Sequence, residues 1–188
     1  FMALILRLLK QNGRAAVVLP DGFLFGEGMK SRLKQALLEE ANLHTIVRLP
    51  NGVFSPYTNI KTNILFFTKG TPTEDVWFYE HPYPEGVTNY NKTKPMRFEE
   101  YQPEIDWWGD EADGFKTRVE TPQAWKVSSE ELAARGYNFD LKNQHEVESE
   151  NHDPDELLAE YDAAQKEIQG LRDQLKEILS EALTGDHP

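Results

Sequence analysis

The chain has 188 residues, no cysteine and a formal net charge of −12. The lack of cysteine excludes disulfides and thiolate metal sites and fits a reducing compartment. The apolar N-terminal stretch of about ten residues is too short to cross a bilayer, which takes about 20 residues. We therefore expect a cytoplasmic protein without membrane contact. The charge is uneven, because residues 1–70 carry nine Lys/Arg and four Asp/Glu whereas residues 71–188 carry 11 and 28. The acidic second part repels phosphates, so any contact with a nucleic acid would lie in the first 70 residues or in a partner.

Residues 1–70 predict a helix followed by strand, helix, strand, long loop and strand. Residues 1–10 are apolar at helical spacing, and short apolar runs at 13–19, 43–49 and 61–69 are bounded by turn residues, which is typical of buried strands. Because Val17, Val18 and Leu19 are consecutive, we expect the first strand to be covered on both faces. Residues 29–38, between the first two strands, have the spacing of an amphipathic helix.

This order of elements predicts an α/β fold, the closing half of an open sheet. Such sheets bind ligands beyond the carboxyl ends of their strands, so function is expected in the loops at residues 20–28 and 50–60. Asp21 directly follows the first strand. Its side chain either points into this cleft or serves the Asp-Gly turn, and we favour the turn.

Residues 71–150 have a different composition. Residues 75–79 predict an edge strand from their aromatic and β-branched content, and Pro, Gly and Asn then interrupt regular structure up to residue 103. Ser128 and Glu131 predict the start of a short helix that ends at Gly136, after which residues 137–141 extend out of the core. Acidic residues surround the interleaved aromatic side chains, so we expect packing against the sheet rather than stacking on bases. These aromatic residues are Tyr83, Tyr90, Phe98, Tyr101, Trp107, Trp108 and Phe115.

Residues 151–188, called the arm below, predict a long terminal helix. Asp153 suits the helix cap, Pro154 the first helical position and Gly185 the end. Apolar residues alternate at spacings of four and three, which is a heptad seam that either folds back on its own domain or, as we favour, binds another chain. We expect the partner-binding residues to be Leu157, Tyr161, Ile168, Leu171, Leu175 and Ile178.

Three stretches, in this order, resemble the modification subunits of type I restriction-modification enzymes, which are adenine-N6 DNA methyltransferases. They are LPDGFLFG at residues 19–26, RLPNGVFSPYTNIKTNILFFTKG at 48–70 and SSEELAARGYNFDLKN at 128–143. The resemblance covers nearly the whole chain. It implies the carboxyl-terminal part of a Rossmann-like methyltransferase domain at residues 1–80, an irregular aromatic wrap or linker at 81–150 and a helical coiled-coil-like arm at 151–188.

Two motifs of that family are not in this sequence. It has no Gly-rich loop after a strand for S-adenosylmethionine and no Asn/Asp-Pro-Pro-aromatic tetrapeptide for the target adenine, and its Gly26-Glu-Gly28 lies in a polar loop where a structural turn is expected. We therefore expect a fragment of a larger subunit that is inactive alone, with no catalytic or cofactor-binding residue of its own.

The resemblance implies that residues 51–63 lie beside the target-base pocket. Phe54 or Tyr57 would stack on a flipped adenine or would only pack the loop, an alternative that the sequence leaves open. Lys61 would contact a backbone phosphate, and Asn59 or Asn63 a phosphate or a base edge. The five histidines have no metal-site spacing, so no metal is expected.

The intact subunit would transfer a methyl group from S-adenosylmethionine to adenine N6 in double-stranded DNA. By the same resemblance it would act with a specificity subunit, a second modification subunit and possibly a restriction subunit, and the arm would dock on the specificity subunit. Two alternatives stay open: a solitary adenine methylase with a helical tail, and a non-catalytic assembly module that keeps the sheet as a scaffold.

Overall fold

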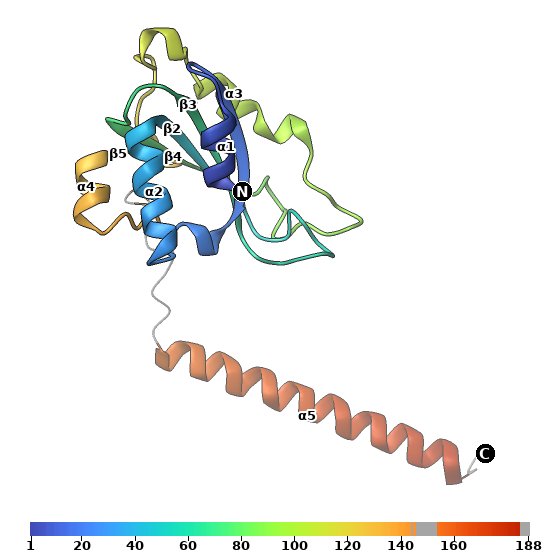
Figure 1. Ribbon diagram of the computed structural model, residues 1–188. Coiled ribbons are helices and arrows are strands. Elements are labelled where there is room, and N and C mark those ends of the chain that lie inside the picture. The colour runs from blue at the N-terminus through green and yellow to red at the C-terminus, as the bar shows by residue number, and fades with distance from the viewer. Residues whose placement is uncertain (144, 146–153, 185–188) are drawn as a thin grey trace. The chain divides into compact units, whose positions relative to one another are not determined.

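The computed structural model describes residues 1–143, residue 145 and residues 154–184. The chain divides into two compact units, Phe1–Glu146 and Val147–Pro188. The first unit contains a five-stranded mixed sheet with helices around it (Figure 1). Its elements are α1 (Met2–Leu8), β1 (Arg14–Pro20), a 3₁₀ turn (Asp21–Phe23), α2 (Met29–Glu40), β2 (Ala41–Arg48), β3 (Thr62–Lys69), β4 (Asp75–Glu80), a 3₁₀ turn (Phe98–Tyr101), α3 (Gln102–Trp107), a 3₁₀ turn (Glu111–Asp113), β5 (Ala124–Ser128) and α4 (Ser129–Ala134).

The strand order brings the functional loops to one edge of the sheet. The order is β1-β3-β2-β4-β5, with β2 parallel to β4 and the other neighbours antiparallel. Because β3 is antiparallel to both β1 and β2, the carboxyl ends of β1, β2 and β4 lie at the same edge. The predicted order of strand, helix, strand, loop and strand over residues 13–70 is confirmed.

One face of the sheet carries the main apolar core. Met2 and Leu6 of α1 and Leu37 and Leu38 of α2 are buried against side chains of the strands, and Figure 1 shows both helices on the same side of the sheet. Met2 and Leu6 are four positions apart on α1 and Leu37 and Leu38 are adjacent on α2, so each pair lies on one face of its helix, as helical spacing predicts. At about 25 cal/mol per Å² of apolar surface, this burial is the principal contribution to the stability of the unit.

Two expectations about the strands are wrong. Strand β1 is an edge strand in which exposed and partly buried residues alternate, so Val18 is 49% exposed while Val17 and Leu19 pack against the core. Strand β4, expected at an edge, lies inside the sheet between β2 and β5. Strand β5 was not predicted, and it pairs Trp125 with Phe78, whose rings stack 5.5 Å apart.

The aromatic segment packs on the opposite face of the sheet, as predicted. Trp107 lies 5.1 Å from Tyr79 and Trp108 lies 4.7 Å from Phe66, measured between ring centroids. The segment is more regular than expected, because it includes α3 and 3₁₀ turns. Phe98 is an exception to the packing, since its side chain stays largely exposed.

The stretch after α4 also differs from its prediction. Ser128 caps α4 by accepting a hydrogen bond from the Glu131 N–H at 3.2 Å, as expected. Residues 137–141 do not leave the core, because Phe139 is fully buried, Leu141 is buried, and the Phe139 N–H donates to the Leu24 carbonyl at 3.0 Å. This stretch therefore closes the core next to the loop that follows β1.

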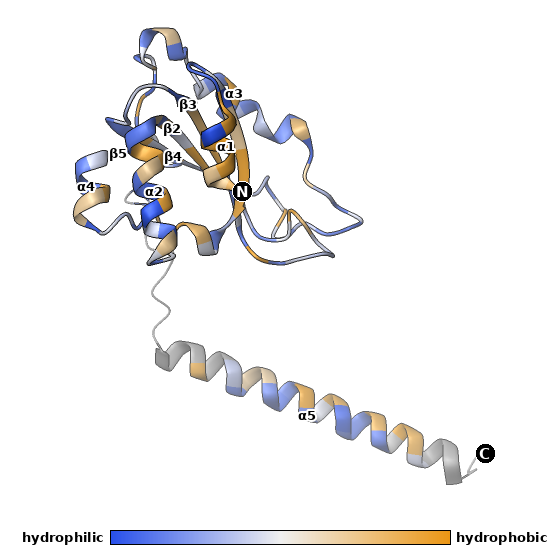
Figure 2. Cartoon of the chain, viewed as in Figure 1, coloured by the Kyte–Doolittle hydropathy of each residue, from blue (hydrophilic) through white to orange (hydrophobic). Residues whose placement is uncertain are grey.

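The second unit contains one helix, α5 (Pro154–Thr184), as predicted. Apolar residues recur along it between polar ones (Figure 2). The expected cap Asp153 and end Gly185 lie outside the described residues. Within the described residues, no helix is long and apolar enough to cross a membrane.

Candidate functional site

A cavity of about 250 Å³, called the edge cavity below, lies where the carboxyl ends of β1, β2 and β4 meet. Ligands of open α/β sheets bind at this edge, which makes the edge cavity the candidate site. It is lined by Asp21, Arg48, Leu49, Pro50, Asn51, Lys61, Asn63, Glu80, His81, Pro82 and Tyr83. Most of its residues are polar, and the cationic side chains of Arg48 and Lys61 are accompanied by the carboxylates of Asp21 and Glu80, so the cavity offers both donors and acceptors to a hydrogen-bonding ligand.

Arg48, the last residue of β2, is the best-connected side chain of the edge cavity. Its Nη1 donates to the Leu141 carbonyl at 2.6 Å, and its Nη2 donates to Asp140 Oδ1 at 2.9 Å. Asp21 Oδ1 lies 3.8 Å from the same Nη2. The guanidinium therefore lies between groups from two distant parts of the chain, residues 140–141 and Asp21, an arrangement that suits its planar set of donors.

Asp21 and Asn63 form one wall of the edge cavity. Asn63 Nδ2 donates to Asp21 Oδ1 at 3.0 Å, and the Asp21 N–H donates to the Lys61 carbonyl at 2.8 Å. Asp21 also begins the 3₁₀ turn after β1, where its carbonyl accepts from the Leu24 N–H. The backbone of Asp21 forms the turn, whereas its side chain, which we expected to serve the turn, lines the cavity and accepts from Asn63.

The loop between β2 and β3 holds the predicted base-stacking residues. The Tyr57 side chain is 93% exposed and that of Phe54 is 39% exposed. The Tyr57 ring is thus the more open of the two to solvent. The loop itself is tightly built, because Gly52 has φ +80° and a Cβ there would collide with the Tyr90 carbonyl.

The structure places the other predicted DNA contacts at two locations, the edge cavity and the adjacent loop. Lys61 is exposed and lines the edge cavity, so its ammonium group is accessible there. Asn63 lines the same cavity but is 1% exposed and engaged with Asp21. Asn59 is exposed in the loop and is not among the lining residues. The structure thus brings Lys61 and Asn63 together at the cavity and leaves Phe54, Tyr57 and Asn59 on the adjacent loop.

Sequence reasoning missed Arg48, Asp140 and His81. His81 directly follows β4, its N–H donates to the Arg48 carbonyl at 2.9 Å, and its Nδ1 contacts Glu104 Oε1 in a buried pair. Arg48 stands just before the Pro-Asn-Gly turn, which was a signal for the strand end. Its partners at residues 140 and 141 are more than 90 positions away, and the sequence carries no local signal for them.

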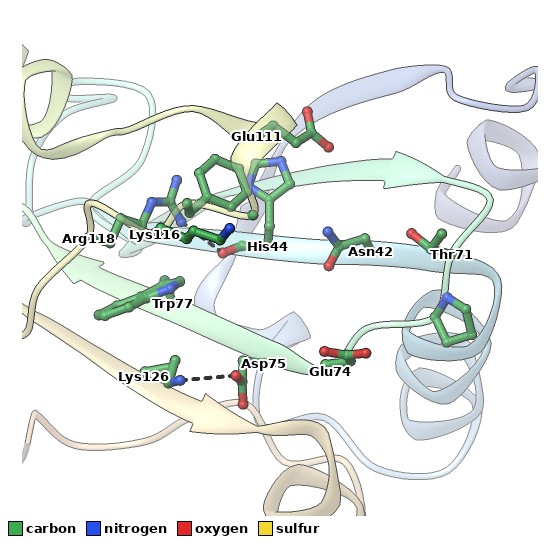
Figure 3. Close-up of a pocket in the computed structure, with 13 residues that line it drawn as sticks. Asn42, His44, Thr71, Glu74, Asp75, Trp77, Glu111, Lys116, Arg118 and Lys126 are labelled. Carbon is green, nitrogen blue, oxygen red and sulfur yellow. Dashed lines mark hydrogen bonds and ion pairs between the residues drawn. The ribbon is translucent and has the colours of Figure 1, made fainter.

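A larger cavity of about 520 Å³ lies at the opposite edge of the sheet, near the start of β2 and β4 (Figure 3). Its charged residues are of both signs, and Lys126 is paired with Asp75 at 3.1 Å. His44 in its wall is buried at a bulge of β2, and burial, together with Arg118 and Arg14, lowers its pKa to about 3. None of the predicted site residues lines this cavity, and its neutral histidine and paired charges suit a structural role.

The loop that carries the Gly-x-Gly sequence is held to helix α2 by hydrogen bonds. The Gly26-Glu-Gly28 loop, which precedes α2, is tied to that helix, because Lys34 Nζ donates to the Leu24 carbonyl at 2.6 Å and to the Gly26 carbonyl at 3.0 Å. Lys30 Nζ donates to the Gly22 carbonyl at 2.9 Å. The carbonyls of Gly22, Leu24 and Gly26 thus accept hydrogen bonds from lysines of α2, which agrees with the structural turn expected here. No group of three or more metal-ligating side chains occurs among the described residues.

The arm presents the predicted seam to its surroundings. Tyr161, Ile168, Leu171, Leu175 and Ile178 are each between 43% and 62% exposed on α5. The side chain of Leu157 lies outside the described residues. Leu158 and Leu179 are also exposed and widen the apolar stripe.

Many nucleotide- and cofactor-dependent proteins have strands whose carboxyl ends meet at one cavity, so this geometry alone does not identify the protein family. A family model for N-6 DNA Methylase matches residues 1–153. The chain belongs to this family.

Relatives in sequence show which kind of N-6 DNA methylase the chain resembles. The methylase subunit of the type I restriction enzyme EcoEI from Escherichia coli is 64% identical over 186 residues, which are 99% of this chain and 38% of that subunit. The EcoKI methylase subunit from Escherichia coli strain K12 is 37% identical over 142 residues, 71% of this chain and 26% of that subunit. The chain thus spans well under half the length of these relatives. The predicted resemblance to type I modification subunits is confirmed.

Solved structures agree with the sequence relatives. A modification subunit of a putative type I restriction enzyme from Vibrio vulnificus YJ016 matches with a TM-score of 0.70 and 43% identity, over 79% of this chain and 32% of that one. The EcoKI M protein matches with a TM-score of 0.62 and 28% identity, over 93% of this chain and 42% of that one. The predicted fold class, part of a Rossmann-like methyltransferase sheet followed by a terminal helix, is confirmed.

Proposed function

We propose that this chain forms the base-side edge and the docking arm of a DNA methyltransferase subunit that methylates adenine at N6. The observation that carries the proposal is the edge cavity, where three strand ends meet beside an exposed aromatic loop in a chain of the N-6 DNA methylase family. The intact subunit takes its methyl group from S-adenosylmethionine. The cofactor site and the catalytic tetrapeptide belong to the part of the subunit that this chain does not contain.

Tyr57 and Phe54 are the proposed stacking residues for the flipped adenine. A base leaves the duplex at a cost of a few kcal/mol, and stacking on an aromatic ring recovers about 1–3 kcal/mol of it. The exposure of Tyr57 supports this role, because its ring has an open face and packs nothing in the described residues. Lys61, accessible at the edge cavity, is the proposed phosphate contact, and Asn59 and Asn63 are the proposed contacts to a phosphate or a base edge.

The partners of the subunit follow from the arm. We propose that the seam on α5 docks on helices of a specificity subunit, which selects the DNA sequence, and that a second modification subunit and a restriction subunit join the complex. A solved relative, with a TM-score of 0.68 and 32% identity, is described as showing complex assembly of the type I R-M system. Acidic residues flank the seam at Asp155, Glu156, Glu160, Asp162 and Glu167. A basic rim on the partner would complement them.

The proposed stacking role is tested by Tyr57→Ala and Phe54→Ala in the full-length subunit assembled with its specificity subunit. We expect a loss of about 1–3 kcal/mol in binding to DNA or to the transition state. The melting temperature should barely change for Tyr57→Ala, because the ring is exposed.

Ile60→Ala is the matched control, since Ile60 is an exposed apolar residue of the same loop without a ring. The control should methylate DNA normally. Normal DNA binding in both aromatic variants, with a lowered melting temperature, would show that the rings only pack the loop.

A further inference from the structure

The Arg48 guanidinium links the edge cavity to residues 140 and 141, which follow α4. Asn63 Nδ2 donates to Asp21 Oδ1 at 3.0 Å, Asp21 Oδ1 lies 3.8 Å from Arg48 Nη2, and that nitrogen donates to Asp140 Oδ1 at 2.9 Å. The second terminal nitrogen of Arg48 donates to the Leu141 carbonyl at 2.6 Å. One line of contacts thus joins the cavity wall to residues 140 and 141.

Residues 138–141 form a fixed anchor for this line. Phe139 is fully buried, and its N–H donates to the Leu24 carbonyl, which also accepts from Lys34 Nζ. The Asp140 N–H donates to Asn138 Oδ1 at 2.9 Å. Because the anchor is held by the buried phenyl ring and by these hydrogen bonds, it fixes where the Arg48 guanidinium lies.

The position of Asp21 depends on which groups accept hydrogen bonds from the Arg48 guanidinium. A largely buried cation must have hydrogen-bond partners, because an unpaired charge is costly there. With Asp140 and the Leu141 carbonyl in place, Arg48 approaches Asp21 only to 3.8 Å, and Asp21 keeps its hydrogen bond to Asn63. If Asp140 lost its charge, Asp21 would be the nearest remaining carboxylate and would be drawn away from Asn63.

We propose that Arg48 is a positioning residue, anchored by Asp140, that holds Asp21 and Asn63 in the arrangement that shapes the wall of the edge cavity, where the proposed function places DNA. The inference rests on the proposed function, which places DNA at this cavity. It adds that residues 138–141, which follow α4, help to orient the site. Neither Arg48 nor Asp140 needs to touch DNA.

The test uses the full-length subunit assembled with its specificity subunit and carrying Asp140→Asn, Arg48→Lys, Asn63→Ala or the pair Arg48→Lys/Asn63→Ala. Methyl transfer to duplex DNA gives kcat and KM, and fluorescence anisotropy gives the DNA dissociation constant. The control is Asp75→Asn, which removes an exposed ion pair with Lys126 at the opposite edge of the sheet.

Asp140→Asn and Arg48→Lys should each raise KM and the DNA dissociation constant about tenfold, as expected for losing a hydrogen bond to a charged group, while kcat and complex assembly stay near wild type. In the Asn63→Ala background, Arg48→Lys should add nothing further, because Arg48 acts through Asn63. The control should bind DNA as the wild type does.

The proposal is overturned if the fold-changes in the DNA dissociation constant caused by Arg48→Lys and Asn63→Ala multiply in the double variant. It is also overturned if the variants lower the melting temperature but leave DNA binding unchanged. Failure of the proposed function is seen separately, as a wild-type complex that transfers no methyl group to adenine. The DNA dissociation constants still decide the coupling between Arg48 and Asn63 in that case.

Discussion

At the scale of single residues, the structure shows which side chains depend on contacts that no local pattern reveals. The Pro-Asn-Gly turn after β2 placed the functional loop correctly, because Pro and Gly act through their own backbone conformations. Arg48 and His81 could not be assigned, since their roles come from Asp140 and Glu104, which the fold brings to them from distant positions. Lys61 was predicted, and its accessible position at the cavity agrees with the proposal.

His44 gives a prediction for pH dependence. Burial lowers its pKa in the folded protein to about 3, below the usual 6.5, with further lowering from Arg118 and Arg14. The unfolded chain therefore binds a proton between about pH 6.5 and 3 that the folded chain does not, so stability falls as the pH falls through this window.

Urea unfolding at pH 7.5 and pH 5 measures this effect. We expect the loss attributable to His44 to be on the order of 1–2 kcal/mol, and it should be absent in His44→Asn. Equal pH dependence of the variant and the wild type would contradict a buried neutral His44.

At the scale of elements, periodicity predicted the elements whose pattern is strong in a short window. The apolar runs were sufficient to predict β2 and β3, and the heptad spacing was sufficient to predict α5. Strand β5 was not predicted, because it is only five residues long, includes the polar Lys126 and Ser128, and exists through its pairing with β4. The position of β4 inside the sheet could not be predicted for the same reason.

The seam of α5 gives a prediction for assembly. Ile168→Asp combined with Leu175→Asp should abolish complex formation with the specificity subunit, because burying each large aliphatic side chain contributes roughly 1.5–3 kcal/mol. The melting transition of the Phe1–Glu146 unit should be unchanged, since these two side chains are exposed on α5. Co-purification measures assembly, and removing the chain after Asn151 should give the same result.

Ala163→Asp combined with Gln169→Asp is the matched control, because it adds the same number of charges to α5 away from the seam residues. This variant should assemble normally. Undiminished assembly of the seam variant or of the truncated chain would rule out the arm as the docking element.

At the scale of the whole molecule, the chain matches only part of the length of its relatives. It spans 38% of the EcoEI methylase subunit and 42% of the EcoKI M protein chain. Its glycine loop before α2 has the Gly22 and Gly26 carbonyls bound to lysines, and the sequence has no Gly-rich loop directly after a strand. We therefore expect isothermal calorimetry of the 188-residue chain to show no binding of S-adenosylmethionine. Micromolar affinity would contradict this expectation.

The central claim is that this chain is part of an adenine-N6 DNA methyltransferase that acts through a specificity subunit. The most direct measurement incubates the full-length subunit with S-adenosylmethionine and duplex DNA, with and without the specificity subunit, and quantifies methylated nucleosides by mass spectrometry after digestion of the DNA. The account predicts N6-methyladenine, formed only when the specificity subunit is present. Unmethylated DNA with the complete complex, or a methyl group on cytosine, would contradict it.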